Sequence, residues 1–214
     1  QLRLVGSQGR AFRGVELRVV RDNGEAVAVG EVGEVLVRGA TVFSSYWNRP
    51  DATAESFIDS WFRTGDLGTL DERGWLSLVD RKKDMILFAG ENVYAAKVER
   101  VLYEHPSVQM AAVFGVPDPG GQFGELVKAV VQLKTGAILQ QRDLTAFCAK
   151  SLARYKLPAI VEYIEVMPLT GSGKVHKSAL RTADAAIVSK MDAPFGAHDP
   201  ALSHMLWQVQ WRDL

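Results

Sequence analysis

The chain has 214 residues, enough for one large domain or two small ones, and its 47% hydrophobic and 23% charged content is that of an ordinary globular protein. Its 25 lysines and arginines balance its 25 aspartates and glutamates, so no net positive field is available to hold a nucleic acid. We therefore expect no nucleic-acid partner and a function on small molecules.

The single cysteine, Cys148, excludes an intramolecular disulfide and favours a reducing compartment. No apolar run approaches the roughly 20 residues that a transmembrane helix needs, so no transmembrane segment is expected. The chain starts at Gln1 rather than at methionine, from which we expect a fragment of a longer protein. We expect a cytoplasmic location and leave peripheral association with a membrane open.

The first third of the chain has the alternation of β-strands. Apolar residues alternate over residues 15–19 and again over 35–37, on either side of the turn-forming run Asp22-Asn23-Gly24. Residues 75–79 have the composition of a further strand. We predict an antiparallel β subdomain over residues 1–79, with one buried face, ending at the polar run 80–84.

Beyond that run the apolar spacing becomes helical. It predicts one helix after an Asn92 cap and a second helix over residues 144–152. The strand-like stretches between and after these helices are residues 111–116, 126–133 and 160–166. The predicted fold class is α+β, in which the β subdomain is followed by a small mixed domain, residues 85–181, with a central sheet and flanking helices.

The remaining stretch, residues 182–214, is predicted to be a tail. Asp199-Pro200 is a typical helix start, with Asp as N-cap and Pro at the first helical position. An apolar stripe follows at Leu202, Met205, Leu206 and Val209, so an amphipathic helix is expected.

Three clusters along the chain contain the residues of chemical interest: 62–68, 80–92 and 168–174. Taken alone, Thr64-Gly65-Asp66 is interpreted as a tight reversal, and Arg81-Lys82-Lys83 as a solvated linker whose charge Asp80 and Asp84 largely cancel. Gly171-Ser172-Gly173-Lys174 is not a P-loop, because Pro168 and Val175 stand where that motif needs Gly and Ser or Thr.

Taken together and in this order, the clusters resemble the adenylate-forming superfamily of acyl-CoA synthetases, luciferases and nonribosomal-peptide adenylation domains. The resemblance runs from about Gly6 to Arg181, and its supporting segments are residues 30–39, 46–50 and 80–86. These segments look most like medium- or long-chain fatty-acyl-CoA ligases. The second domain is then the small lid domain of that family.

The resemblance implies roles for three residues near the predicted boundary. Asp66 is expected to accept hydrogen bonds from both ribose hydroxyls of ATP, which its two carboxylate oxygens suit. Arg81 is expected to support the same nucleotide. Lys83 matches the family's hinge, within residues 80–84, about which the small domain swings between two poses over the active site.

It also implies roles for two residues of the small domain. Lys174 matches the catalytic lysine, whose ammonium offsets the negative charge that gathers when a carboxylate attacks the α-phosphate of ATP. Gly90 matches the position beside the channel for the pantetheine of CoA, where a side chain would obstruct the thiol. A plain turn glycine before the Asn92-capped helix is an equally acceptable interpretation of Gly90.

Other reactive residue types receive only structural interpretations. Cys148 is expected to be a core thiol on the apolar face of its helix. The histidines show no metal-ligand spacing, so no metal site is predicted. The resemblance implies Mg²⁺ only as a companion of ATP, with its ligands outside this chain.

Departures from the family bear on activity. Its phosphate loop, its adenine- and Mg²⁺-binding segment and its acyl pocket should all precede Gln1, so a missing N-terminal domain of the same protein is the expected partner. Ala89 replaces a commoner glycine, and Lys97 a commoner glutamate. We do not expect the chain to form acyl-adenylate alone.

Three functions remain in competition. The first is the C-terminal part of an ATP-dependent acyl-CoA synthetase, an acid-thiol ligase using ATP, CoA and a carboxylic acid, expected to be a fatty acid. The second is a fatty-acyl-AMP ligase or adenylation domain that transfers to carrier-protein phosphopantetheine. The third is a non-catalytic interaction module, which the joint presence of Asp66, Arg81, Lys83 and Lys174 disfavours.

Overall fold

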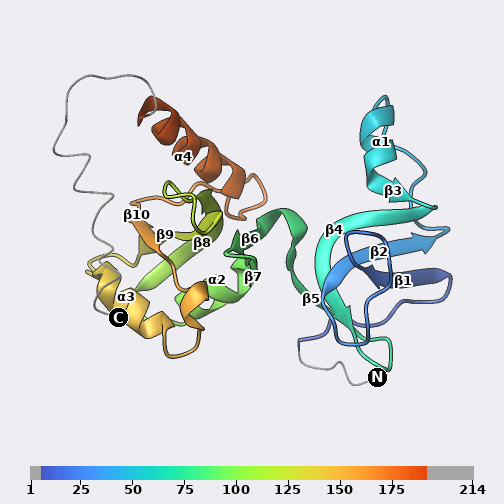
Figure 1. Cartoon of the computed structure of the whole chain (residues 1–214), viewed down its shortest axis with the longest axis horizontal. Helices are drawn as coiled ribbons and strands as arrows, with labels where there is room; N and C mark the ends of the chain where they lie inside the picture. The colour runs from blue at the N-terminus through green and yellow to red at the C-terminus, as the bar shows by residue number, and fades with distance from the viewer. Residues whose placement is uncertain (1–5, 192–214) are drawn as a thin grey trace. The chain divides into compact units, whose positions relative to one another are not determined.

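The structure, a computed structural model, describes residues 6–191, with side chains described up to residue 184 (Figure 1). The described part divides into two compact units. The first contains the residues up to Ile86 together with Asn92–Lys97, and the second contains Leu87–Glu91 together with the residues from Val98 onward.

The first unit is built on one antiparallel sheet. Its strand order is β1-β2-β4-β3, and β5 pairs with β4 as well. The strands are β1 (Val15–Val20), β2 (Gly33–Gly39), β3 (Phe57–Ile58), β4 (Trp61–Leu70) and β5 (Leu76–Arg81). The strands predicted from alternation and from the 75–79 run are therefore confirmed.

The sheet of the first unit is buried on more than one face. Val19 and Val20 are both 4% exposed, and neighbouring residues of a strand point to opposite faces. The prediction of one buried face is therefore wrong at this end of the sheet. Val20 forms a small core with Leu36 and Trp61, and the Trp61 ring also contacts the guanidinium groups of two nearby arginines at 4.5 and 4.4 Å.

A short helix in the first unit was not predicted. α1 spans Pro50–Ser56, with Pro50 in its first turn and Asp51 supplying a favourable negative charge at the N-terminus. The Arg49-Pro50-Asp51 sequence carries the start signal of this helix.

Between the two sheets the chain forms a short helix and a hairpin. The 3-10 helix η1 (Lys82–Asp84) precedes strands β6 (Met85–Phe88) and β7 (Glu91–Tyr94), which pair with each other. Helix α2 (Ala95–Tyr103) begins directly after β7. Asn92 therefore lies inside a strand, and the prediction that it caps the helix is wrong. The carboxylate of Asp80 accepts from the Ala96 amide instead, at 3.1 Å.

The second unit contains a three-stranded sheet of order β10-β9-β8, in which β8 and β9 are antiparallel and β9 and β10 parallel. The α+β prediction is confirmed. The elements are β8 (Val108–Pro117), β9 (Glu125–Leu133), α3 (Gln141–Cys148), η2 (Arg154–Lys156), β10 (Ile160–Tyr163) and α4 (Lys177–Met191). Helix α3 ends at Cys148, so Leu152 lies beyond the helix that was predicted to include it.

Both faces of this sheet are covered. On one face Phe114 and its buried neighbours pack against Leu180 of α4. Helices α2 and α3 lie on the opposite side of the sheet from α4 (Figure 1). Their inward residues Leu102, Leu144 and Cys148 are fully buried, which confirms Cys148 as a core thiol.

Helix α4 continues to Met191, so it passes residue 182, where the tail was predicted to begin. The amphipathic helix predicted from Asp199 lies outside the described residues. Within the described residues, no helix combines the length and the apolar character that a membrane crossing requires.

Candidate functional site

Asp66 and Arg81 are neighbours on adjacent strands of the first unit. They face each other in the register of β4 and β5, and Arg81 Nε lies 3.2 Å from Asp66 Oδ1. The Arg81 side chain is 61% exposed and that of Asp66 29% exposed. The pair is thus a surface feature in which a carboxylate is oriented by a guanidinium and remains accessible to a ligand.

A bulge in β4 presents Asp66. The register between β2 and β4 shifts so that Thr64, Gly65 and Asp66 stand opposite Val35. Gly65 has φ +70, and the Thr64 hydroxyl donates to the Val35 carbonyl at 2.7 Å while accepting from the Asp66 amide at 3.1 Å. The strand continues through this segment, so the interpretation as a tight reversal is wrong: the glycine permits a bulge instead.

The polar run 80–84 is not a solvated linker, contrary to the interpretation of its sequence alone. Arg81 contacts Asp66, whereas the Lys82 ammonium lies 2.6 Å from Asp22 and 3.0 Å from Glu34. Asp84 is only 8% exposed. Lys83 lies in the 3-10 helix and is exposed. Neighbouring basic residues therefore serve different partners.

The Glu34 carboxylate is the buried centre of this charge network. It is 4% exposed and receives a forked pair of hydrogen bonds from Arg63, at 3.2 and 2.6 Å, besides its contact with Lys82. Burial would raise the pKa of Glu34, but the bonds from Arg63 and Lys82 outweigh that effect and hold the pKa below its ordinary value. The network fixes β2 and β4 to the segment that carries Arg81 and Lys83.

Lys174 lies at the end of a tight, exposed hairpin loop in the second unit. Leu169 and Val175 form the bridge that closes the loop, and Thr170 exchanges backbone hydrogen bonds with Gly173 and Lys174 at 2.9 and 2.7 Å. Lys174 itself is exposed. Within the described residues its ammonium makes no ion pair, so the charge is presented to solvent.

The base of this hairpin is fixed to the unit's core. The His176 amide donates to the Pro168 carbonyl at 2.8 Å, and Lys177, at the start of α4, pairs with Glu99 of α2 at 2.7 Å. The same Glu99 oxygen accepts from the Val113 amide of β8 at 2.7 Å. The base of the hairpin is thus held by the core of the second unit, while its tip and Lys174 are exposed.

Gly90 occupies the turn between β6 and β7. Both central residues of this turn have positive φ, +49 at Ala89 and +83 at Gly90, which is the geometry of a type I′ hairpin. A Cβ built at Gly90 would meet nothing within 4 Å in this chain. Backbone conformation therefore requires the glycine here, and the predicted clearance for a thiol remains a prediction.

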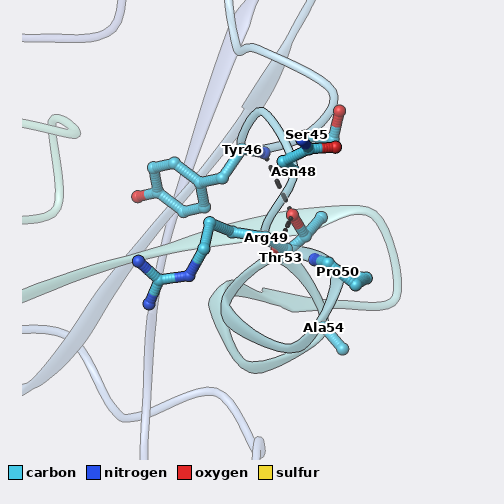
Figure 2. A pocket seen from close by; sticks show the side chains of 7 residues that line it. All are labelled: Ser45, Tyr46, Asn48, Arg49, Pro50, Thr53 and Ala54. Carbon is cyan, nitrogen blue, oxygen red and sulfur yellow. Dashed lines mark hydrogen bonds between the residues drawn. The ribbon is translucent and has the colours of Figure 1, made fainter.

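The predicted residues divide between the two units. Asp66, Arg81 and Lys83 belong to the first, and Gly90 and Lys174 belong to the second. A surface pocket of the first unit lies around the start of α1, where the Tyr46 amide donates to the Thr53 hydroxyl at 3.0 Å (Figure 2). None of the five predicted residues lines it. Among the described residues no cluster of His, Cys, Asp or Glu is arranged to hold a metal ion.

Several residues that support the site were missed by reasoning from the sequence. Glu34 and Glu99 are charged residues that hold other segments in place through partners far away in the chain. No local pattern signals such pairings. Asp118, by contrast, precedes the turn-forming run Pro119-Gly120-Gly121, and its carboxylate accepts three backbone amides. That turn was detectable by composition.

Comparison with known proteins matches two family models to this chain. The model described as the AMP-binding enzyme C-terminal domain matches residues 97–174, and the model described as AMP-binding enzyme matches residues 1–47.

Curated and solved relatives agree with these matches. A feruloyl-CoA synthase of Amycolatopsis sp. is 45% identical over 83% of this chain and 36% of its own length. The long-chain-fatty-acid–CoA ligase FadD13 of Mycobacterium tuberculosis is 41% identical over 88% of this chain and 37% of its own. The crystal structure of ATP-bound MatB from Rhodopseudomonas palustris superposes with a TM-score of 0.77 at 36% identity, over 83% of this chain and 35% of that one. The chain thus spans about a third of the length of the relatives it matches.

Proposed function

We propose, from the premise that this chain belongs to the AMP-binding enzymes, that it is the C-terminal part of an ATP-dependent acyl-CoA synthetase. In the first half-reaction a substrate carboxylate oxygen attacks the α-phosphorus of ATP, and pyrophosphate leaves. In the second, the sulfur of CoA attacks the acyl carbon, and AMP leaves as the thioester forms. The chain supplies residues to both steps and does not catalyse them by itself.

The exposed Lys174 hairpin is the observation that carries this proposal. Its ammonium is presented on a tip whose base is held by backbone bonds and by the Lys177–Glu99 pair. The first half-reaction brings an anionic carboxylate to an anionic phosphate, so the barrier contains a large repulsive term. An ammonium inserted between them offsets the charge as it gathers, and a glycine-flanked loop lets it approach closely.

The Asp66–Arg81 pair fits the ribose of the nucleotide. Arg81 contacts one oxygen of the carboxylate, and the second oxygen is available in the described part of the chain to accept from a hydroxyl. Hydrogen bonds from two neighbouring ribose hydroxyls to one carboxylate would fix the orientation of the nucleotide and also add to its affinity. The arginine keeps the carboxylate in position while the ligand is absent.

Residues 80–84, with Lys83 at the pivot, are proposed as the hinge about which residues 85–181 move between the two half-reactions. After adenylation Lys174 is withdrawn, and the Gly90 turn comes to the reacting centre. The bare Cα of Gly90 then leaves the thiol of CoA a clear path. Mg²⁺ would neutralise phosphate charge in the first step, with ligands outside this chain.

The carboxylic acid is proposed to be a fatty acid. The likeness to a long-chain-fatty-acid–CoA ligase supports this choice, whereas the likeness to a feruloyl-CoA synthase supports an aromatic acid. A panel of both acid types separates the two.

The test uses the full-length enzyme that contains this chain, assayed for AMP, pyrophosphate and acyl-CoA with that panel. Asp66→Asn should raise KM for ATP about 10- to 100-fold, the loss of one charged hydrogen-bond acceptor. Glu72→Gln, an exposed carboxylate in the β4–β5 turn, is the matched control and should leave KM unchanged. Absence of AMP formation with every acid would overturn the function, and an unchanged KM in Asp66→Asn would overturn the role of Asp66.

A further inference from the structure

The turn at Ala89-Gly90 is held by residues 118–125, which are the loop between β8 and β9 together with the first residue of β9 and are called the second loop below. Gly90 is exposed, and a Cβ placed on it would contact no atom of the described residues within 4 Å. Ala89 adopts φ +49, a conformation that costs an alanine free energy. An exposed and strained turn needs other contacts to keep a single position.

Those contacts come from three residues of the second loop. The Leu87 amide donates to Glu125 Oε2 at 2.7 Å, and the Ala89 amide donates to the Phe123 carbonyl, also at 2.7 Å. The ring of Phe88 stacks on that of Phe123 with centroids 5.0 Å apart and planes 8° from parallel. Phe88 also forms a β-bridge with Gly124. Consecutive residues 87, 88 and 89 are thus all bound to one loop.

The loop itself is shaped by one carboxylate. Asp118 accepts from the amides of Gly120, Gln122 and Phe123 at 3.0, 2.8 and 3.0 Å. The hydrogen bond from the Phe123 amide lowers the pKa of Asp118, and the hydrogen bonds from the other two amides lower it further. The carboxylate is therefore ionised and a strong acceptor at neutral pH. Phe123, which carries both the ring and the carbonyl that hold the turn, is therefore placed by Asp118.

Space around Glu125 is also restricted. A Cβ at Gly115, on the neighbouring strand β8, would lie 2.7 Å from Glu125 Oε1. Gly115 thus leaves room for the carboxylate that reaches Leu87. Substituting alanine at Gly115 would displace this carboxylate while leaving the amino-acid sequence of the turn, and the identity of residue 125, unchanged.

We propose that Asp118 and Glu125 are positioning residues for the thioester-forming half-reaction, which they serve by holding the Ala89-Gly90 turn where the thiol of CoA passes. This proposal rests on the proposed function. A misplacement of about 1 Å near a reacting centre can cost about 10²-fold in rate, so a turn fixed by several short contacts has a functional use. The proposed role of both residues acts through the position of the turn, which Glu125 contacts directly and Asp118 reaches through Phe123.

The experiment measures both half-reactions on the same preparation of full-length enzyme, as ATP–pyrophosphate exchange and as thioester formation from supplied acyl-AMP and CoA. Glu125→Ala should lower thioester formation at least tenfold and raise KM for CoA, with pyrophosphate exchange unchanged within twofold. Glu125→Gln keeps an acceptor for the Leu87 amide and should retain most of the activity. Gly115→Ala should reproduce the Glu125→Ala pattern.

Asp118→Ala should show the same loss, and Asp118→Asn a smaller one. The matched control is Asp71→Ala, because Asp71 organises the β4–β5 turn of the first unit in the same way, accepting from Arg73 and Trp75 at 2.9 and 2.8 Å. It should lower the two half-reactions equally or not at all. Amide hydrogen exchange of residues 86–91 should accelerate in Glu125→Ala and not in Asp71→Ala.

Two results overturn the proposal in distinguishable ways. Equal loss of both half-reactions in Glu125→Ala, or full retention of thioester formation, refutes the positioning role while leaving the synthetase assignment intact. Failure of the parent enzyme to form thioester from acyl-AMP and CoA refutes the proposed function and this inference together.

Discussion

Removing the charge of Lys128 should weaken the attachment of α4 to the sheet of the second unit. Lys128, on β9, is 7% exposed, and its ammonium contacts Asp184 of α4 at 2.5 Å and Glu162 of β10 at 2.7 Å. Burial would lower the pKa of Lys128, but the bonds to the two carboxylates outweigh burial and raise it. The interaction is therefore present at neutral pH and is lost only as the pH rises through that raised pKa.

The magnitude follows from the burial of the partners. Breaking a fully buried ion pair from one side costs about 3–5 kcal/mol, because the other charge is left unpaired. Here Asp184 is 18% exposed, and Glu162, at 43%, is screened by solvent and contributes little. We expect Lys128→Met, which keeps the apolar stem, to cost about 2 kcal/mol.

Amide hydrogen exchange of α4 and β9 measures this loss of stability. A local measurement is chosen because the two units of the chain can unfold separately. A loss of about 2 kcal/mol corresponds to exchange about 30-fold faster. Lys134→Met, at an exposed lysine just after β9, is the control and should exchange as the parent does. The double variant Lys128→Met with Asp184→Met should recover at least half of the loss, because no charge is left unpaired at the Asp184 site. Unchanged protection of α4 and β9 in Lys128→Met would show that this ion pair does not attach α4 to the sheet.

Three further predictions concern the stability and reactivity of the chain. The stability difference between the parent and Glu34→Gln, measured by urea unfolding, should be constant above about pH 4.5 and shrink as pH falls through the lowered pKa of Glu34; a difference independent of pH would contradict the network. Ala89→Gly should raise stability by about 0.5–1 kcal/mol, since relief of positive-φ strain exceeds the added entropy of the unfolded chain, and a lower thermal midpoint would contradict the strain. Burial raises the pKa of Cys148 to about 11, so a thiol reagent at pH 8 should label it slowly in the folded chain and rapidly in denaturant; equal rates would place it at the surface.

Apolar patterning predicted most of the strands. β1 and β2 contain alternating apolar residues, and the strands of the second unit contain short apolar runs, so the α+β class follows from the sequence although the buried faces do not. The Thr64-Gly65-Asp66 bulge could not be predicted in this way, because it depends on the register between β4 and β2. A bulge and a reversal use the same local residues.

Long-range pairing explains the other differences. Asn92 is a residue type that often caps helices, but pairing of β6 with β7 extends the strand through it. Asp80, 16 residues before Ala96 in the chain, accepts from the amide of that residue in the first turn of α2 instead. Glu34 lies in a strand whose apolar pattern gives no reason to expect a buried acid. The cost of burying its charge is offset by hydrogen bonds from Arg63 and Lys82, which are distant in the chain. The site residues themselves were predicted from resemblance to a family. The residues that hold them in place, such as Glu34 and Glu99, were found only from contacts in the three-dimensional structure.

The Lys174 ammonium is proposed to serve the first half-reaction and not the second. The measurement that separates these roles is the ratio of pyrophosphate exchange to thioester formation from supplied acyl-AMP in full-length Lys174→Ala. We expect this ratio to fall about 10²- to 10³-fold relative to the parent enzyme, and to be unchanged in Lys134→Ala. An equal loss of both half-reactions in Lys174→Ala, which leaves the ratio unaltered, would refute this role of Lys174.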